Sequence, residues 1–197
     1  MFKRLAQSFF TQNTLTVAQQ LLGKHIIHET PLGIRAGIIV ETEAYLAHEP
    51  ACHAYKGITQ RNSALFGPVG HAYVYFIYGN HYCFNTVAHD ETVVAGGVLI
   101  RAVQPTQGIA LMAKARKGIS GYQISNGPGK LTQALGITHV HNNIDLTTSK
   151  ELFIADGIYI DPLDIINSPR IGISQAKDLP WRFCISDNKW LSDFHKK

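Results

Sequence analysis

The segment that most constrains the fold runs from residue 71 to residue 88. Two stretches rich in aromatic and β-branched residues, 71–78 and 81–88, flank the dipeptide Gly79-Asn80. Such stretches favour extended strands, and a Gly/Asn pair between them is a strong signal for a tight turn. The segment therefore predicts a β-hairpin.

The rest of the chain predicts strands with a few short helices. A Pro/Gly turn at 30–33 separates two strand-like stretches, 25–29 and 34–42, and indicates a second hairpin. Residues 46–70 read as a long ordered loop, and such loops are usually functional. Helices are expected at 14–22, 107–117 and 129–135, and further strands at 98–105, 152–154, 158–160, 170–174 and 182–186. This order predicts a single mixed α+β domain over residues 1–197.

Composition excludes several classes of protein. Apolar residues make up 45% of the chain and charged residues 16%, which is typical of a folded globular domain and not of a disordered one. We find no apolar stretch long enough to span a membrane and no signal peptide, so no membrane partner is expected. Three scattered cysteines favour a reducing compartment. Residues 50–144 hold seven Lys or Arg side chains against two acidic ones, a modest indication of a polyanionic partner.

Acidic and histidine side chains are the first candidates for chemistry. Glu41 and Glu43 share a face if the strand persists, and Glu49 follows closely. These carboxylates suit acid–base chemistry or metal binding, although solvated carboxylates at a strand end are favoured on spacing alone. Ten histidines are present, but neither Cys52-His53 nor His139-Val140-His141 has a partner pair at zinc-site spacing. We therefore expect no metal and no cofactor.

Tyrosines are concentrated in one part of the chain. Six of the eight fall within 38 positions: Tyr45, Tyr55, Tyr73, Tyr75, Tyr78 and Tyr82. Core packing is the ordinary interpretation of aromatic strands. Tyr78, however, adjoins the predicted turn, where a large ring is exposed, and the preceding loop carries Lys56 and Arg61. That combination suits a wedge that enters a stack of bases.

A series of short motifs resembles the alkyladenine (3-methyladenine) DNA glycosylase family. The similarity extends from about residue 10 to the C-terminus. The motifs are VETEAYL (40–46), PACHA (50–54), RN (61–62), FGP (66–68), GHAYVYFIYG (70–79), Asn85, VLIRA (98–102) and GPGKL (127–131). The resemblance implies a curved antiparallel β core with surrounding helices and a protruding hairpin. It also implies a repair enzyme that acts on double-stranded DNA containing alkylated purines.

The resemblance also implies roles for single residues. Glu43 matches the general base that deprotonates a water attacking the sugar C1′, and Arg101 matches the arginine that helps to hold that water and the adjacent phosphate. Tyr45, His53 and Tyr75 match the walls around the everted base, and Asn85 matches the residue associated with excluding the guanine 2-amino group. Tyr78 matches the ring that fills the gap in the duplex, beside Asn80, which is apolar in some relatives. A backbone carbonyl within 170–173 is expected to help hold the water. From their charge, Lys56, Arg61 and Lys130 are expected at the DNA backbone.

The implied chemistry fits these residue types. Purines such as 3-methyladenine and 7-methylguanine are cationic, so tyrosine faces attract them and they leave readily. A carboxylate that activates one water then completes hydrolysis with inversion, as in inverting glycosidases. Hypoxanthine and ethenoadenine are neutral, so their excision is chemically more difficult. No lysine matches a Schiff-base nucleophile, which predicts a monofunctional enzyme that leaves an abasic site.

Two other functions are compatible with the sequence. One is a non-catalytic protein that bends duplex DNA or marks lesions through the basic middle and Tyr78. The other is a hydrolase of free nucleosides with a tyrosine-lined pocket. For the glycosylase we expect a monomer in the cytoplasm, associated with the nucleoid in a bacterium, or in the nucleus of a eukaryote.

The implied pocket sets a condition on the hairpin register. A two-residue turn would pair Tyr78 with His81 and place Tyr75 and Asn85 on opposite faces. The pocket needs both on one face. We therefore expect a three-residue loop, 79–81, that pairs Tyr75 with Asn85, or a bulge.

Overall fold

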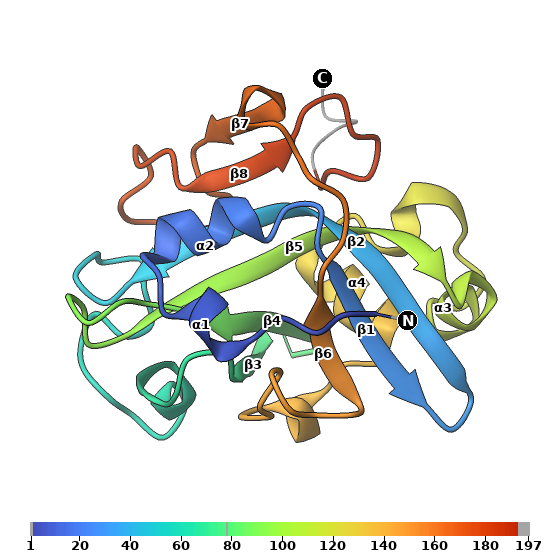
Figure 1. Ribbon diagram of the computed structural model, residues 1–197, viewed down its shortest axis with the longest axis horizontal. Coiled ribbons are helices and arrows are strands. Elements are labelled where there is room, and N and C mark those ends of the chain that lie inside the picture. Colours follow the sequence, from blue (N-terminus) through green and yellow to red (C-terminus); the bar gives the residue numbers. More distant parts are fainter. Residues whose placement is uncertain (1, 78, 193–197) are drawn as a thin grey trace.

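The computed structural model describes residues 2–77 and 79–192, which form a curved antiparallel sheet with short helices around it (Figure 1). The strand order is β3-β4-β5-β2-β1-β6, and β7 joins through β8, which pairs with β2. The strands are β1 (His25–Thr30), β2 (Gly33–Leu46), β3 (Ala72–Ile77), β4 (His81–Val87), β5 (Gly96–Gln107), β6 (Leu152–Ala155), β7 (Ile165–Ser168) and β8 (Arg182–Ile185). The predicted mixed α+β class with a curved antiparallel core is confirmed.

Strand β2 is the central strand of the sheet and pairs with three other strands. It pairs with β5 along its length, with β1 through its first half, and with β8 at Glu41–Glu43. Register shifts against β5 occur next to Gly37 and on both sides of Glu41. Bulges of this kind bend a strand and redirect its side chains. The bend therefore falls on the acidic segment that the sequence singles out.

The described helices are short. They are α1 (Gln7–Phe10), α2 (Thr14–Gln20), α3 (Ile109–Ala115) and α4 (Pro128–Leu135), with 3₁₀ turns η1 (Ser63–Phe66), η2 (Gly121–Ile124), η3 (His139–His141) and η4 (Pro162–Asp164). The side chain of Asn13 caps α2 by accepting a hydrogen bond from the Leu15 amide at 3.0 Å. None of these helices has the length and apolar character needed to cross a membrane.

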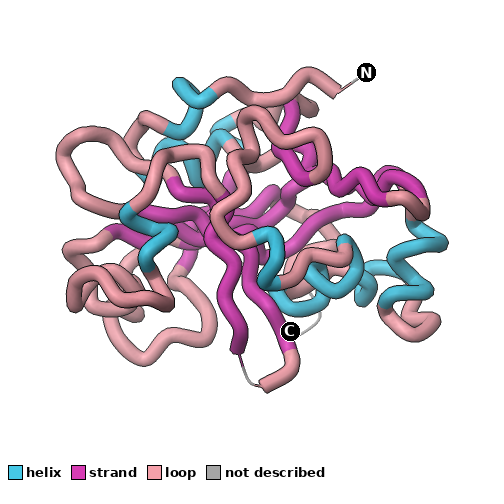
Figure 2. Tube along the Cα trace, turned by 90° about the horizontal axis from the view of Figure 1, so that it is seen from below, coloured by secondary structure: helices cyan, strands magenta, loops and turns pink. Residues whose placement is uncertain are grey.

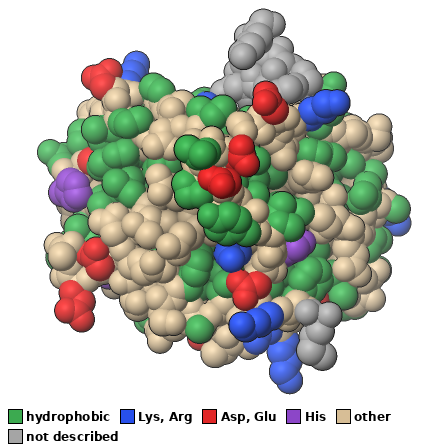
Figure 3. Space-filling view, turned by 45° about the horizontal axis from the view of Figure 1, so that its top comes forward, with side chains coloured by type: hydrophobic (Ala, Val, Ile, Leu, Met, Phe, Trp, Pro, Cys, Tyr) green, Lys and Arg blue, Asp and Glu red, His purple; other side chains and the backbone are tan. Residues whose placement is uncertain are grey.

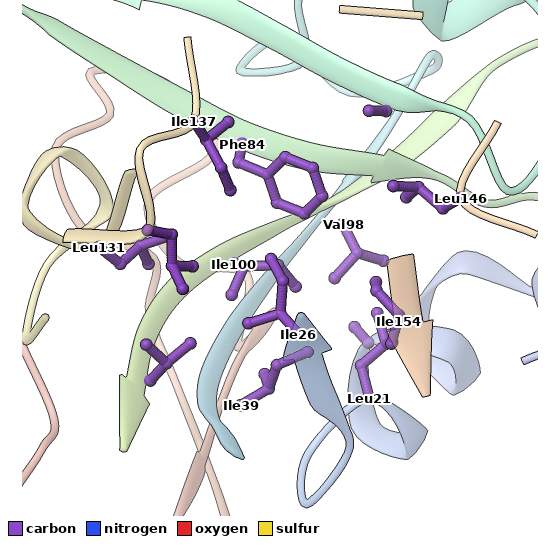
Figure 4. Packing of buried hydrophobic residues seen from close by; sticks show 14 of the residues in the cluster. Leu21, Ile26, Ile39, Phe84, Val98, Ile100, Leu131, Ile137, Leu146 and Ile154 are labelled. Carbon is purple, nitrogen blue, oxygen red and sulfur yellow. The ribbon is translucent and has the colours of Figure 1, made fainter. Parts of the chain in front are cut away.

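The main core packs helices against the strands of the sheet. It joins side chains from β1, β2, β4 and β5 to residues of α2 and α4. Figure 4 shows Ile39, Phe84 and Ile100 in the middle of the cluster, between Leu131 of α4 on one side and Leu21 and Ile154 on the other. Burial of these aliphatic and aromatic groups is the dominant stabilising term and fixes the bent strands in place.

The hairpin β3–β4 extends from the body of the protein (Figure 2). Its last pair is Ile77 with His81, so three residues separate the strands. The predicted loop length is thus confirmed, but the predicted register is wrong by two residues, since Tyr75 pairs with Cys83. A shift of two preserves the face of every side chain. Tyr75 and Asn85 therefore share a face, as the implied pocket requires.

Several predicted elements differ in the tail. Residues 158–160 and 170–174 form no strand, whereas β7 forms at Ile165–Ser168, where no element was predicted. Ile158 and Tyr159 are exposed and pair with no strand, so the apolar pattern there does not mark a buried sheet. Residues 170–174 instead form a loop that contacts the candidate site described below, through the side chain of Arg170 and the backbone amide of Ile171.

Candidate active site

A cavity of about 550 Å³ opens between the β3–β4 hairpin, β2, β5 and two loops. One loop precedes η1, and the other is the segment 171–173. Most of the predicted base-pocket and catalytic residues line it, and Tyr73 and Ile171 join them. These lining residues are Tyr45, His53, Arg61, Tyr73, Tyr75, Asn85, Arg101 and Ile171.

Glu43 lies directly behind this wall. Its side chain is fully buried. One carboxylate oxygen, Oε2, accepts a hydrogen bond from the Tyr45 hydroxyl at 2.8 Å. The other, Oε1, accepts from the Ile171 amide at 2.7 Å and lies 3.2 Å from Arg101 Nη1. Because all three partners line the cavity, the carboxylate is held rigidly at its edge.

Arg101 connects Glu43 to a second buried carboxylate. Its Nε donates to Glu41 Oε1 at 3.0 Å while Nη1 faces Glu43. Burial alone would lower the pKa of Arg101, but Glu43 and Glu41 together raise it above its ordinary value. The guanidinium therefore stays charged at the wall of the cavity.

Glu41 anchors this arrangement from behind. It is fully buried and accepts hydrogen bonds from Arg101, from Arg182 Nε at 2.8 Å, and from the amide and hydroxyl of Ser192, both at 2.7 Å. Burial alone would raise the pKa of Glu41. Arg101 and Arg182 outweigh this effect, so the net pKa of Glu41 is below its ordinary value. The favoured interpretation of Glu41 and Glu43 as solvated strand-end carboxylates is wrong, because the bulge at Glu41 turns this segment inward.

Three neutral rings form one aromatic wall. The centroids of His53 and Tyr75 are 4.7 Å apart and those of Tyr73 and Tyr75 are 5.1 Å apart. His53 Nδ1 lies 2.9 Å from the Tyr73 hydroxyl. Burial, and then the charge of Arg61, lowers the pKa of His53, and burial raises the pKa of Tyr75 well above its ordinary value. The rings are therefore uncharged at neutral pH.

Asn85 lies in the floor of the cavity beside these rings. It is 5% exposed, and its Nδ2 donates to the Tyr73 carbonyl at 3.0 Å. This hydrogen bond to the backbone fixes the orientation of the Asn85 side-chain amide. Asn85 therefore lines the same cavity as Tyr73 and Tyr75.

Of the described residues predicted to contact DNA, Arg61 lines the cavity, whereas Lys56, Asn80 and Lys130 do not. The Arg61 guanidinium is 5.7 Å from the Tyr75 ring at the mouth. Lys56 is exposed on the loop before η1. Lys130 donates to Asn126 Oδ1 at 2.8 Å, two residues after Pro128, which lines the cavity. Asn80 is exposed at the hairpin end, and Tyr78 lies outside the described residues.

The face of the molecule seen in Figure 3 carries charges of both signs. Figure 3 shows acidic and basic side chains interspersed with apolar ones there, without a continuous basic patch among the described residues in view. Such a mixed surface provides no single-sign field for a polyanion.

Arg170 is a site residue that the sequence analysis did not identify, and its partner is Glu49, which was named there only as a candidate carboxylate. Arg170 Nη1 and Nη2 bind the two carboxylate oxygens of Glu49 at 2.7 and 3.0 Å, and Nη1 also donates to the Ala44 carbonyl at 2.8 Å. The guanidinium lies 4.6 Å from the centroid of the Tyr45 ring. Glu49 was visible as an acidic residue, but no local signal pairs it with an arginine 121 positions away. The ion pair with Glu49 thus holds the Arg170 guanidinium against the Tyr45 ring.

Comparison with known proteins agrees with this geometry. Residues 8–189 match the family described as methylpurine-DNA glycosylase (MPG). A protein of Carboxydothermus hydrogenoformans, provisionally named a 3-methyladenine DNA glycosylase, is 46% identical over 188 residues, 95% of this chain and 98% of its own. Similar proteins with the same provisional name occur in Prosthecochloris aestuarii, 47% identical over 96% of this chain and 91% of its own, and in Methanoculleus marisnigri, 42% identical over 95% and 98%. The chain thus belongs to the methylpurine-DNA glycosylase family, and the prediction of a monofunctional DNA glycosylase acting in base excision repair is confirmed.

Proposed function

We propose that this protein excises alkylated purines from duplex DNA with a water molecule activated by Glu43. The observation that carries the proposal is the position of the Glu43 carboxylate. Three donors hold it, and each of them also lines a cavity walled by aromatic rings. A fixed carboxylate beside a base-sized aromatic site is what hydrolysis of an N-glycosidic bond requires.

The cavity suits a cationic purine base. The target nucleotide has to leave the stack to reach it, at a cost of a few kcal/mol. The uncharged face of Tyr75 attracts 3-methyladenine or 7-methylguanine by about 0.5–2 kcal/mol through cation–π contact. Hypoxanthine and ethenoadenine lack that charge, so their excision is slower.

In the proposed reaction, the water oxygen forms a bond to C1′ as the bond from C1′ to the purine nitrogen breaks. The water proton passes to Glu43, and the electron pair of the broken bond neutralises the departing base. The product is an abasic site with inverted configuration at C1′. Because the Tyr45 hydroxyl covers Oε2, the water enters beside this hydroxyl. Arg101 balances the negative charge of Glu43 and faces the DNA phosphate.

Tyr78 and Asn80 at the hairpin loop occupy the gap that the everted nucleotide leaves in the duplex. Lys56, Arg61 and Lys130 contact the phosphates around it. The protein acts as a monomer without a cofactor, in the compartment that holds the cell's DNA.

The direct test is incubation with duplex DNA containing 7-methylguanine or 3-methyladenine, followed by chromatography of the released bases. We expect free methylated base and an abasic strand from the wild-type protein, and binding without release from Glu43→Gln. Binding without release from both proteins would favour a DNA-bending protein instead. Release from methylated nucleosides but not from duplex DNA would favour a nucleoside hydrolase.

A further inference from the structure

A cluster of two histidines and one glutamate lies outside the base cavity. His28 is on β1, His141 ends η3, and Glu151 directly precedes β6. The pairing of β1 with β6 places His28 opposite Leu152 and so beside Glu151, and the ring centroids of His28 and His141 are 4.8 Å apart. Both histidines are buried, whereas the Glu151 side chain is 58% exposed. None of the three lines the cavity or enters the proposed reaction.

The spacing of the three ligand atoms fits one metal ion. Glu151 Oε1 lies 3.4 Å from His28 Nε2 and 3.4 Å from His141 Nε2, and all three ligand atoms lie within 4.8 Å of one another. Around a tetrahedral Zn²⁺ with bonds of about 2.0–2.1 Å, neighbouring ligand atoms are about 3.4 Å apart. Only a small approach of the two imidazoles is needed to complete that geometry.

The hydrogen bond of His28 Nδ1 directs the other ring nitrogen, Nε2, into the cluster, where it lies 3.4 Å from Glu151 Oε1. His28 Nδ1 lies 2.7 Å from the Leu135 carbonyl, which only accepts, so Nδ1 carries the hydrogen. The lone pair of Nε2 therefore points into the cluster. Metal-binding histidines usually have such an outer hydrogen bond to a carbonyl or carboxylate.

His141 supplies the second nitrogen. Its Nε2 is buried and lies 3.4 Å from Glu151 Oε1, but it makes no well-formed hydrogen bond among the described residues. Its Nδ1 lies 3.0 Å from the Thr138 amide nitrogen and 3.3 Å from the Thr138 carbonyl oxygen, so the backbone accommodates either tautomer. Donation from Nδ1 to the carbonyl leaves the Nε2 lone pair for a metal. An unsatisfied buried nitrogen is costly, and a bound ion removes that cost.

The surroundings leave room for a cation. Arg35 is the nearby positive group, and its Nη1 donates to the Ala134 carbonyl at 3.2 Å. That contact is on the Nδ1 side of His28, because a Cβ at Gly136 would meet both Arg35 Nη1 and His28 Nδ1. The exposed Glu151 carboxylate leaves the opposite side open for entry of the ion and a water ligand.

We propose that His28 Nε2, His141 Nε2 and the Glu151 carboxylate bind one divalent transition-metal ion, with Zn²⁺ as the best match to two imidazoles and one carboxylate. The ion joins β1, η3 and the start of β6. It therefore stabilises the edge of the sheet, independently of base excision.

The test uses the full chain, dialysed against a chelator and then titrated with Zn²⁺ alone. We expect one ion per chain by elemental analysis. At free Zn²⁺ about 100 times the Kd, we expect the Tm to rise by about 5–10 °C. Co²⁺ in place of Zn²⁺ should give the visible absorption of a tetrahedral site.

Matched variants decide whether the ion binds here. His141→Gln and Glu151→Gln should lose the Tm rise and the Co²⁺ absorption, whereas His139→Gln and Glu29→Gln, neighbouring residues outside the cluster, should keep both. Glu151 is exposed, so its variant folds even if the buried histidine variant does not. The proposal is overturned if the wild-type protein shows no Tm rise, or if the rise persists in Glu151→Gln; the cluster is then an ordinary histidine–carboxylate contact.

Discussion

Replacement of Glu43 by glutamine separates the proposed chemistry from the fold. The glutamine oxygen is able to accept from the Ile171 amide and Arg101, which both approach Oε1. Its amide nitrogen then faces the Tyr45 hydroxyl, which turns from donor to acceptor. Every contact is kept, and Arg101 retains its bond to Glu41.

The expected cost in stability is therefore moderate. Hydrogen bonds to charged groups contribute about 1.5–3 kcal/mol and neutral ones about 0.5–1.5, so each contact loses about 1–1.5 kcal/mol and the three together about 3–4.5 kcal/mol. Loss of a positioned general base lowers a rate by about 10²–10⁴-fold. That loss corresponds to about 3–5 kcal/mol in the activation barrier.

The assay combines three measurements on Glu43→Gln. Single-turnover release of 7-methylguanine gives the rate, fluorescence anisotropy gives duplex affinity, and thermal unfolding monitors the fold. Glu29→Gln, an exposed carboxylate, serves as the control. We expect retained binding with a rate at least about 100-fold lower. A folded variant that excises within a factor of about ten of the wild type would refute Glu43 as the base.

Four further predictions follow from the site. Arg170→Met leaves Glu49 buried without its partner and should destabilise the fold by about 3–5 kcal/mol in denaturant unfolding; an unchanged midpoint would contradict this. Tyr75→Leu should weaken binding of a 7-methylguanine duplex by about 2–30-fold and that of an ethenoadenine duplex less, because only the cation loses 0.5–2 kcal/mol of cation–π attraction. Since the pKa of His53 is lowered from 6.5, the ring gains charge only as pH falls below 6.5, and binding of the cationic lesion to Glu43→Gln should decline there; His53→Gln should abolish that decline. Arg61→Gln should reduce the slope of log affinity against log salt by about 1 if Arg61 neutralises one phosphate.

The elements that could be predicted are those whose signal is local. The aromatic stretches around Gly79-Asn80 predicted the hairpin, whereas the implied pocket, and not the turn itself, required a three-residue loop with Tyr75 and Asn85 on one face. The pairing bears out the loop length and the shared face, although the register differs by two residues. The bulge at Glu41 has no comparable signal, because it results from the pairing of β2 with two partners. The sequence therefore favoured solvated carboxylates where the fold buries them.

Residues that meet across long stretches of chain were not predictable from spacing. Glu49 and Arg170 are 121 positions apart, and His28 and His141 are 113 apart. The search for metal ligands used short intervals, such as His139 to His141, and predicted no site. His141 instead meets His28 on β1, to which no short interval in the sequence connects it. Such contacts depend on tertiary packing, which no local pattern encodes.

The position of Arg170 bears on how the cavity selects a cation. A guanidinium 4.6 Å from the centroid of Tyr45 already occupies one face of that ring and draws electron density from the other. Tyr45 is therefore a weak cation–π partner for the base, and its contribution is stacking and the hydrogen bond to Glu43. Tyr75 has Arg61 at 5.7 Å, farther away and at the mouth. Discrimination between cationic and neutral purines consequently depends more on Tyr75, so Tyr75→Leu should reduce it more than Tyr45→Leu in parallel binding measurements, and the reverse order would contradict this assignment.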